Sequence, residues 1–173
     1  MVIGNLPAAP WLIDNIDLIP RRLPVLDVAC GRGRHALFLA REGWTVHALD
    51  RDAEAVQALE TLVHAQALSI TTEVIDLEAG TPSLGKQRYG AVVVFNYLHR
   101  PLLPAIVDAV APGGILIYET FTVGQARRGR PTNPAFLLVE GELAQLIRPL
   151  DILRSREGDV DGKLVSSIVA TRR

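Results

Sequence analysis

The segment Ala91-Val-Val-Val-Phe-Asn96 constrains the fold of this 173-residue chain more than any other. Its near-continuous apolar run lacks the alternation of a strand with one solvated face, and it is typical of a parallel strand covered on both faces. Strand-like and helix-like segments alternate along the chain before and after it. This alternation predicts an α/β fold, a doubly wound and mostly parallel Rossmann-like sheet.

The hydrophobic pattern places the other elements around that strand. The expected strands are residues 24–29, 44–50, 70–76, 115–120, 151–158 and 163–173, and the expected helices are 34–42, 52–67, 101–110 and 139–148. Pro112-Gly113-Gly114 reads as a turn before the fifth strand. The last two strands are joined by the short turn Val160-Asp161-Gly162, so they must be antiparallel. The sheet should therefore carry one antiparallel strand near the C-terminus.

The size and charge of the chain limit its function classes. Its length is most simply one domain, 1–173, in which residues 1–23 form a short N-terminal cover segment. The net charge of −1 gives no general attraction to nucleic acid or to an anionic membrane. The single cysteine, Cys30, fits a reducing compartment, and neither a signal peptide nor a membrane-spanning run is evident. We expect a cytoplasmic protein without nucleic-acid or membrane partners.

A glycine loop follows the first expected strand. Gly31-Arg32-Gly33-Arg34-His35-Ala36 fits the G-x-G-x-x-G/A fingerprint, in which glycines let the backbone turn and approach a ligand. A tight turn without a ligand is the alternative. Asp50 ends the second expected strand, 17 residues after Gly33, and can accept both hydroxyls of a ribose. Asp50 could instead cap the next helix, but Asp52 can fill that role. Together the two features predict an adenosine-type ligand, either NAD or S-adenosylmethionine.

Carboxylates at the strand ends favour the second ligand. Asp27 lies inside the first expected strand, and Asp76 ends the third. With Asp50 they suit a cationic ligand better than an anionic pyrophosphate. Satisfaction by loop N–H groups is the alternative for Asp27, and a solvated strand end is the alternative for Asp76.

These residues resemble a known family, the class I S-adenosylmethionine-dependent methyltransferases. The resemblance rests on DVACGRG at 27–33, ALD at 48–50, IDLE at 75–78 and APGG at 111–114. It is nearest to small bacterial enzymes of the tellurite-resistance (TehB-like) type, and it covers residues 24–120 well. It implies an enzyme with the class I fold and S-adenosyl-L-methionine as cofactor. The cofactor-binding residues that it implies are Asp27, Ala29, Gly31, Gly33, Asp50, Arg51, Asp76, Leu77 and Asn96.

The reaction implied is an in-line displacement that moves a methyl group to a small-molecule acceptor. Tyr97 and His99 follow the expected strand at 91–96, at the carboxyl end where the ligand is expected, so they are the catalytic candidates. Tyr97 could attract the cationic methyl group through its ring, and His99 could take a proton. A polar cap of the following helix is the alternative for His99. The histidines show no metal-ligand spacing, and we expect no metal.

The substrate candidates follow the fifth expected strand. Glu119 lies near its end, and residues 121–138 form a long loop that holds Arg127, Arg128 and Arg130. Such a loop in a compact domain is often functional, and arginine binds anions, so an anionic acceptor is expected. An arginine-paired edge carboxylate and a solvated charge cluster are the respective alternatives. A NAD(P)-dependent oxidoreductase and a non-catalytic S-adenosylmethionine-binding domain remain the competing functions.

Overall fold

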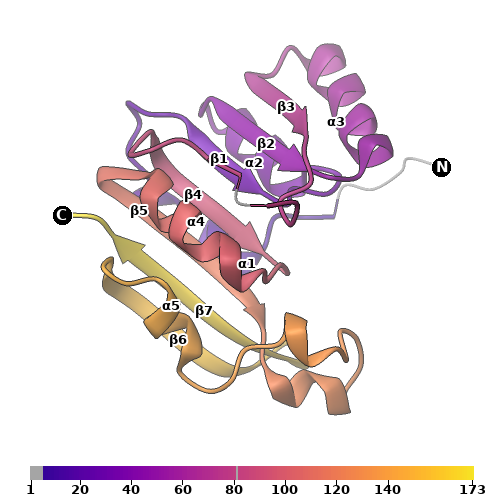
Figure 1. Ribbon diagram of the computed structural model, residues 1–173. Coiled ribbons are helices and arrows are strands. Elements are labelled where there is room, and N and C mark those ends of the chain that lie inside the picture. Colours follow the sequence, from indigo (N-terminus) through magenta and orange to yellow (C-terminus); the bar gives the residue numbers. More distant parts are fainter. Residues whose placement is uncertain (1–5, 81) are drawn as a thin grey trace.

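The computed structural model describes residues 6–80 and 82–173, which form one seven-stranded sheet with helices on both faces (Figure 1). The strands are β1 (Val25–Val28), β2 (Val46–Asp50), β3 (Ile70–Val74), β4 (Tyr89–Phe95), β5 (Val110–Phe121), β6 (Asp151–Val160) and β7 (Lys163–Thr171). They lie in the order β3-β2-β1-β4-β5-β7-β6. Strands β1 to β5 are parallel, whereas β7 runs antiparallel to both of its neighbours. The predicted fold class, including the reversed strand, is confirmed.

Two apolar layers cover the sheet, one on each face. The α-helices are α1 (Pro10–Ile13), α2 (Arg34–Arg41), α3 (Ala53–Gln66), α4 (Leu103–Ala109) and α5 (Glu142–Leu146). Core residues of α1, α2 and α3 pack with Val93 and Phe95, whereas those of α4 and α5 pack with Val92 and Val94. Consecutive residues of β4 thus enter opposite layers, which is the physical reason for its uninterrupted apolar run.

The structure corrects three expected boundaries. Pro112-Gly113-Gly114 does not precede the fifth strand but forms an irregular bulge inside β5, where the register shifts between Tyr89 and Ala91. The helix expected at 101–110 begins as a 3₁₀ turn, Arg100–Leu102, before α4. The helix expected at 139–148 shortens to the five residues of α5, because Gly141 precedes it in a left-handed conformation.

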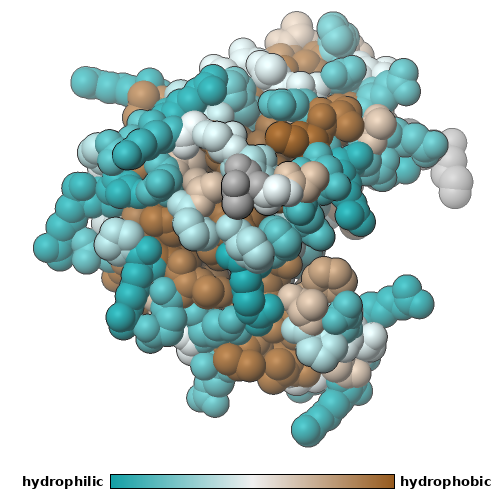
Figure 2. Space-filling view, viewed as in Figure 1, coloured by the Kyte–Doolittle hydropathy of each residue, from teal (hydrophilic) through white to brown (hydrophobic). Residues whose placement is uncertain are grey.

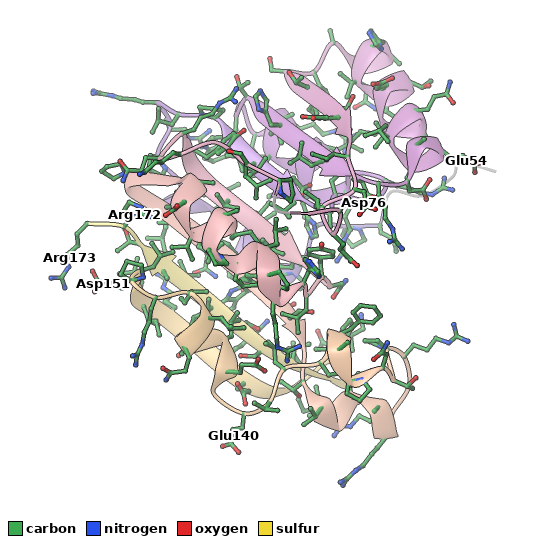
Figure 3. All side chains as sticks on the ribbon, viewed as in Figure 1. Glu54, Asp76, Glu140, Asp151, Arg172 and Arg173 are labelled. Carbon is green, nitrogen blue, oxygen red and sulfur yellow. The ribbon has the colours of Figure 1, made fainter. Side chains whose placement is uncertain are left out.

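The two ends of the strands differ in their contacts. At the end of the sheet where β7 finishes, the guanidinium of Arg172 donates to the carbonyls of Val107 and Val110 at 2.6 and 2.7 Å. Figure 3 shows Arg172 and Asp151 at this end of the sheet and Asp76 at the opposite end. The carboxyl ends of the five parallel strands lie at the Asp76 end, away from the contacts of Arg172.

The N-terminal segment packs on one face of the sheet. Trp11 and Leu12 of α1 are buried, and the Trp11 indole donates to the carbonyl of Ile168 at 3.2 Å. Ile19, after a 3₁₀ turn at Ile16–Leu18, is also buried. Residues 1–5 of the expected cover segment lie outside the described residues. No helix in the described ranges is long and apolar enough to span a bilayer.

Candidate functional site

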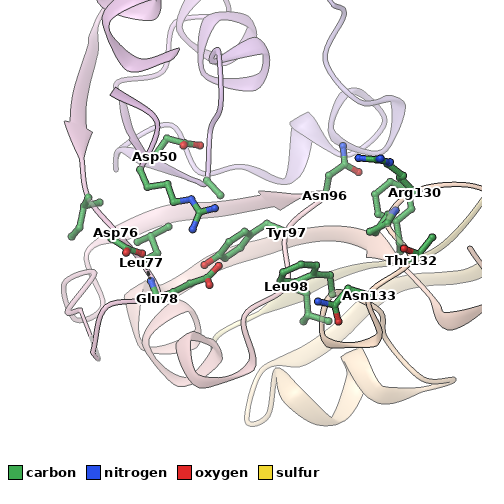
Figure 4. Close-up of a pocket in the computed structure, with 16 residues that line it drawn as sticks. Asp50, Asp76, Leu77, Glu78, Asn96, Tyr97, Leu98, Arg130, Thr132 and Asn133 are labelled. Carbon is green, nitrogen blue, oxygen red and sulfur yellow. Dashed lines mark hydrogen bonds between the residues drawn. The ribbon is translucent and has the colours of Figure 1, made fainter. Parts of the chain in front are cut away.

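A cavity of about 730 Å³ lies where the parallel strands end. Its size is typical of a small-ligand site, and its place beyond the carboxyl ends is where open α/β sheets bind ligands. Figure 2 shows the same region hollowed between the lobe of residues 121–138, at the lower right, and the rest of the molecule. The lining comprises Ala29, Asp50, Arg51, Ile75, Asp76, Leu77, Glu78, Asn96, Tyr97, Leu98, Phe121, Arg130, Pro131, Thr132, Asn133 and Phe136 (Figure 4).

The cavity brings together most of the predicted cofactor residues. Six of the nine line it: Ala29, Asp50, Arg51, Asp76, Leu77 and Asn96. Ala29 and Asn96 hold positive φ angles of 56° and 55°, a conformation that alanine rarely adopts and that asparagine tolerates better. Strained backbone of this kind concentrates at ligand sites, where it aims backbone groups at the ligand. Both residues follow the last residue of a central strand, β1 and β4.

Asp50 connects the end of β2 to the glycine loop. Its carboxylate accepts hydrogen bonds from the backbone N–H of Gly31 at 2.7 Å and from that of Asp52 at 2.9 Å. Asp52 caps α3, accepting from the N–H groups of Glu54 and Ala55, as the sequence predicted. Asp50 is therefore not needed as the helix cap, and half-buried at the cavity wall it can also reach a ligand.

Asp27 lies beneath the loop rather than in the cavity lining. It is 1% exposed, and its carboxylate accepts from the backbone N–H of Ala36 at 3.1 Å. Burial, with a smaller contribution from the nearby Asp50 carboxylate, raises the pKa of Asp27 to about 7 against the opposing effects of the Ala36 hydrogen bond and Arg34. Asp27 thus fastens the first turn of α2 to β1.

The two loop glycines have different surroundings. A Cβ on Gly33 would lie 2.5 Å from Leu59 Cδ1, and Leu59 is fully buried in α3. A Cβ on Gly31 would meet no atom within 4 Å. Gly33 therefore permits close packing of the loop against α3, a role that differs from the ligand contact expected from the sequence.

We expect Gly33→Ala to lower the free energy of unfolding by about 1–3 kcal/mol more than Gly31→Ala does. Both substitutions pay a similar cost for a positive φ, so their difference isolates the contact with Leu59. Chemical denaturation of the two variants measures it. Equal stabilities would show that Leu59 moves aside without cost.

Tyr97 faces the acidic side of the cavity. Its hydroxyl is buried and has no hydrogen-bond partner among the described residues, so a ligand can take it. Burial raises the pKa of Tyr97 to about 12, with Glu78 and Asp76 adding to the rise. Figure 4 shows the ring extending toward Glu78 and Leu77, away from Arg130. His99 stands at the N-cap position of the 3₁₀ turn of Arg100–Leu102, but its side chain makes no capping hydrogen bond there and does not line the cavity.

Residues 121–138 form a fixed wall rather than a loose loop. Two short 3₁₀ helices, Val123–Arg127 and Pro134–Phe136, interrupt it. The guanidinium of Arg100 donates to the carbonyls of Ala135 and Leu137 at 3.0 and 2.9 Å. The same guanidinium makes a bidentate ion pair with the Glu142 carboxylate, with N–O distances of 2.6 and 2.8 Å. Arg100 therefore fastens this wall to the start of α4 and to α5.

The predicted substrate residues separate in the structure. Arg130 lines the cavity, but Arg127 does not, and Arg128 pairs with Asp159 on β6 instead. Glu119 accepts from Arg156 at 3.0 Å and from the Ser167 hydroxyl at 2.6 Å, away from the cavity lining. Glu119 is thus the arginine-paired carboxylate that the sequence left as its alternative.

Sequence reasoning missed part of the lining. Glu78 stands two residues after Asp76, and its acidic side chain at a strand end was an available signal. Phe121, Thr132, Asn133 and Phe136 carried no such signal, because only the path of the 121–138 wall brings them to the cavity.

The sheet order, the reversed β7 and the site at the strand ends define a class I methyltransferase fold. A model of the tellurite resistance protein TehB family matches residues 12–157. The chain belongs to that family.

Individual relatives support the same placement. A probable S-adenosyl-L-methionine-dependent methyltransferase, TehB of Haemophilus influenzae strain 10810, is 30% identical over 83 residues, which are 48% of this chain and 29% of the relative. The chain thus matches less than a third of that protein's length. The crystal structure of TehB from Haemophilus influenzae superposes with a TM-score of 0.75 at 21% identity, over 94% of this chain and 61% of the other. Magnesium protoporphyrin IX methyltransferase from Synechocystis PCC 6803, solved with S-adenosylmethionine bound, superposes with a TM-score of 0.69 at 18% identity. The superposition covers 94% of this chain and 75% of the other.

Proposed function

We propose that the chain transfers a methyl group from S-adenosyl-L-methionine to a small-molecule acceptor by in-line displacement. The observation that carries this proposal is the polarity of the cavity. Asp50, Asp76 and Glu78 line one side of it, whereas Arg130 is on the side of Asn96. An acidic side suits a cationic methyl donor, and a basic side suits an anionic acceptor.

The acidic side fits the donor group by group. The Asp50 carboxylate binds the ribose hydroxyls, and Leu77 and Tyr97 pack against the adenine. The Asp76 carboxylate accepts a hydrogen bond from the adenine amino group. The strained backbone at Ala29 and Asn96 turns main-chain groups toward the methionine part. When bound, the donor supplies an activated methyl group, so the chain's own task is to align the acceptor and exclude water.

The competing oxidoreductase function fits the cavity less well. A dinucleotide brings an anionic pyrophosphate, which the carboxylates of Asp50, Asp76 and Glu78 would repel. Arg51 is the one cation on the acidic side of the described lining. A methyl donor with a sulfonium and an ammonium group meets the opposite, favourable charge.

We expect titration calorimetry to give micromolar affinity for S-adenosyl-L-methionine and no binding of NAD. Release of S-adenosylhomocysteine during a screen of small acceptors would then establish turnover. Binding of NAD alone would overturn the proposal. Donor binding without turnover of any acceptor would favour the non-catalytic alternative.

A further inference from the structure

We infer that the acceptor is an aromatic carboxylate, methylated on its carboxylate oxygen to give a methyl ester. The inference rests on the proposed function and concerns the side of the cavity that the donor does not fill. Phe121, Phe136, Pro131 and Arg130 form that side. Their chemistry specifies a flat apolar body that carries one negative group.

The apolar part of this side is aromatic. Phe121 ends β5, and Phe136 ends the 3₁₀ helix of Pro134–Phe136, so the two rings come from the two ends of the wall. Phe136 is 44% exposed, although it lines the cavity. A solvated phenylalanine at a cavity mouth gains most from covering by another planar apolar surface, and aromatic rings pair favourably with one another.

The charged part is Arg130. Its guanidinium makes no hydrogen bond or ion pair with any residue in the described ranges, whereas Arg128 and Arg100 are paired with carboxylates. In Figure 4 the Arg130 side chain extends toward Asn96, at the end of β4. A free guanidinium binds a carboxylate through two parallel hydrogen bonds, which fixes the direction of the acceptor. It would therefore hold the acceptor's carboxylate beside the point where the donor's methyl group is expected.

No proton acceptor lies on this side. In the described lining, the residues around Arg130 are Asn96, Leu98, Phe121, Pro131, Thr132, Asn133 and Phe136, and none is a His, Asp, Glu, Lys or Cys. An acceptor that reacts here must be nucleophilic without deprotonation by the chain, and Arg130 favours one that is also anionic. A carboxylate satisfies this requirement at neutral pH, whereas an alcohol does not.

The transfer then balances without proton movement. The new bond joins a carboxylate oxygen to the methyl carbon, and the bond that breaks joins that carbon to the sulfonium sulfur. The sulfur keeps the electron pair and becomes a neutral thioether. Arg130 pairs with the acceptor's charge before the reaction and releases the neutral ester afterwards.

The test uses the full chain with benzoate and 2-naphthoate, with benzamide and hexanoate as neutral and non-aromatic controls. Methyl-labelled donor reports the product, and a methyl ester is recognised because alkali releases its label as methanol. Calorimetry of 2-naphthoate binding in the presence of S-adenosylhomocysteine gives a readout independent of turnover. Arg130→Gln removes the proposed contact, Arg130→Lys retains the charge, and Arg127→Gln is the matched control outside the cavity.

We expect alkali-labile product from the aromatic carboxylates and little from benzamide or hexanoate. Arg130→Gln should weaken 2-naphthoate binding at least tenfold with unchanged donor affinity, Arg130→Lys should restore part of it, and Arg127→Gln should behave as the parent. Normal donor affinity without binding or esterification of aromatic carboxylates would overturn this inference and leave the proposed function intact. An alkali-stable product, or a preference for hexanoate, would overturn it as well. Failure to bind the donor would instead overturn the proposed function.

Discussion

Replacing Asp50 with alanine is expected to weaken S-adenosyl-L-methionine binding about a hundredfold, or about 3 kcal/mol. Two losses contribute to this effect. The ribose loses its charge-assisted hydrogen bonds, which are stronger than neutral ones. The glycine loop also loses the acceptor for the Gly31 N–H, now 2.7 Å from the carboxylate. Titration calorimetry measures the change directly.

Two further variants divide this effect. Asp50→Asn keeps a hydrogen-bond acceptor for the loop but removes the charge, so it should fall between the parent and Asp50→Ala. Asp52→Ala removes the neighbouring cap of α3, which is expected to cost about 1 kcal/mol of stability with little change in donor affinity. If Asp50→Ala binds the donor as tightly as the parent, Asp50 does not hold the ribose.

The fold was predictable because burial on both faces leaves a plain mark in the sequence. The run Ala91–Phe95 needs apolar residues in both layers, and the segments on either side must then supply the covering helices. The bulge at Pro112-Gly113-Gly114 could not be predicted in the same way, because these residues are equally common in turns. The bulge depends on a contact far away in the sequence, because the Gly113 N–H donates to the carbonyl of Arg172, just after β7, at 2.7 Å.

The two sides of the cavity differ in how far the sequence predicts them. The donor side uses residues at strand ends, and their position follows from the strands themselves. The acceptor side depends on the path of residues 121–138, which Arg100 fixes through bonds to residues 35 to 42 positions away. Local pattern carries no trace of such contacts. For the same reason, Arg127, Arg128 and Arg130 have three different surroundings although they lie within four residues.

Asp27 is expected to make the stability of the fold fall as the pH rises from about 4 to about 7. Its pKa is about 7 in the folded chain, against the ordinary value of 3.8. Between these values the folded state keeps the proton and the unfolded state releases it, so rising pH favours unfolding. The stabilisation is complete below pH 4 and is lost as the pH passes 7. At about 1.4 kcal/mol per pH unit, the loss approaches about 4 kcal/mol.

The comparison that isolates this group is Asp27→Asn, measured by chemical denaturation from pH 4 to pH 8. The asparagine oxygen can still accept from the Ala36 N–H but carries no charge at any pH. Asp50 and Arg34 remain in both proteins, so the difference reports the Asp27 charge together with its interactions with these two groups. The free energy of unfolding of the variant should rise steadily relative to that of the parent up to about pH 7, and the difference should stay constant above it. A difference that does not change with pH would show that Asp27 is ionised in the fold throughout, with its charge compensated by the loop N–H groups.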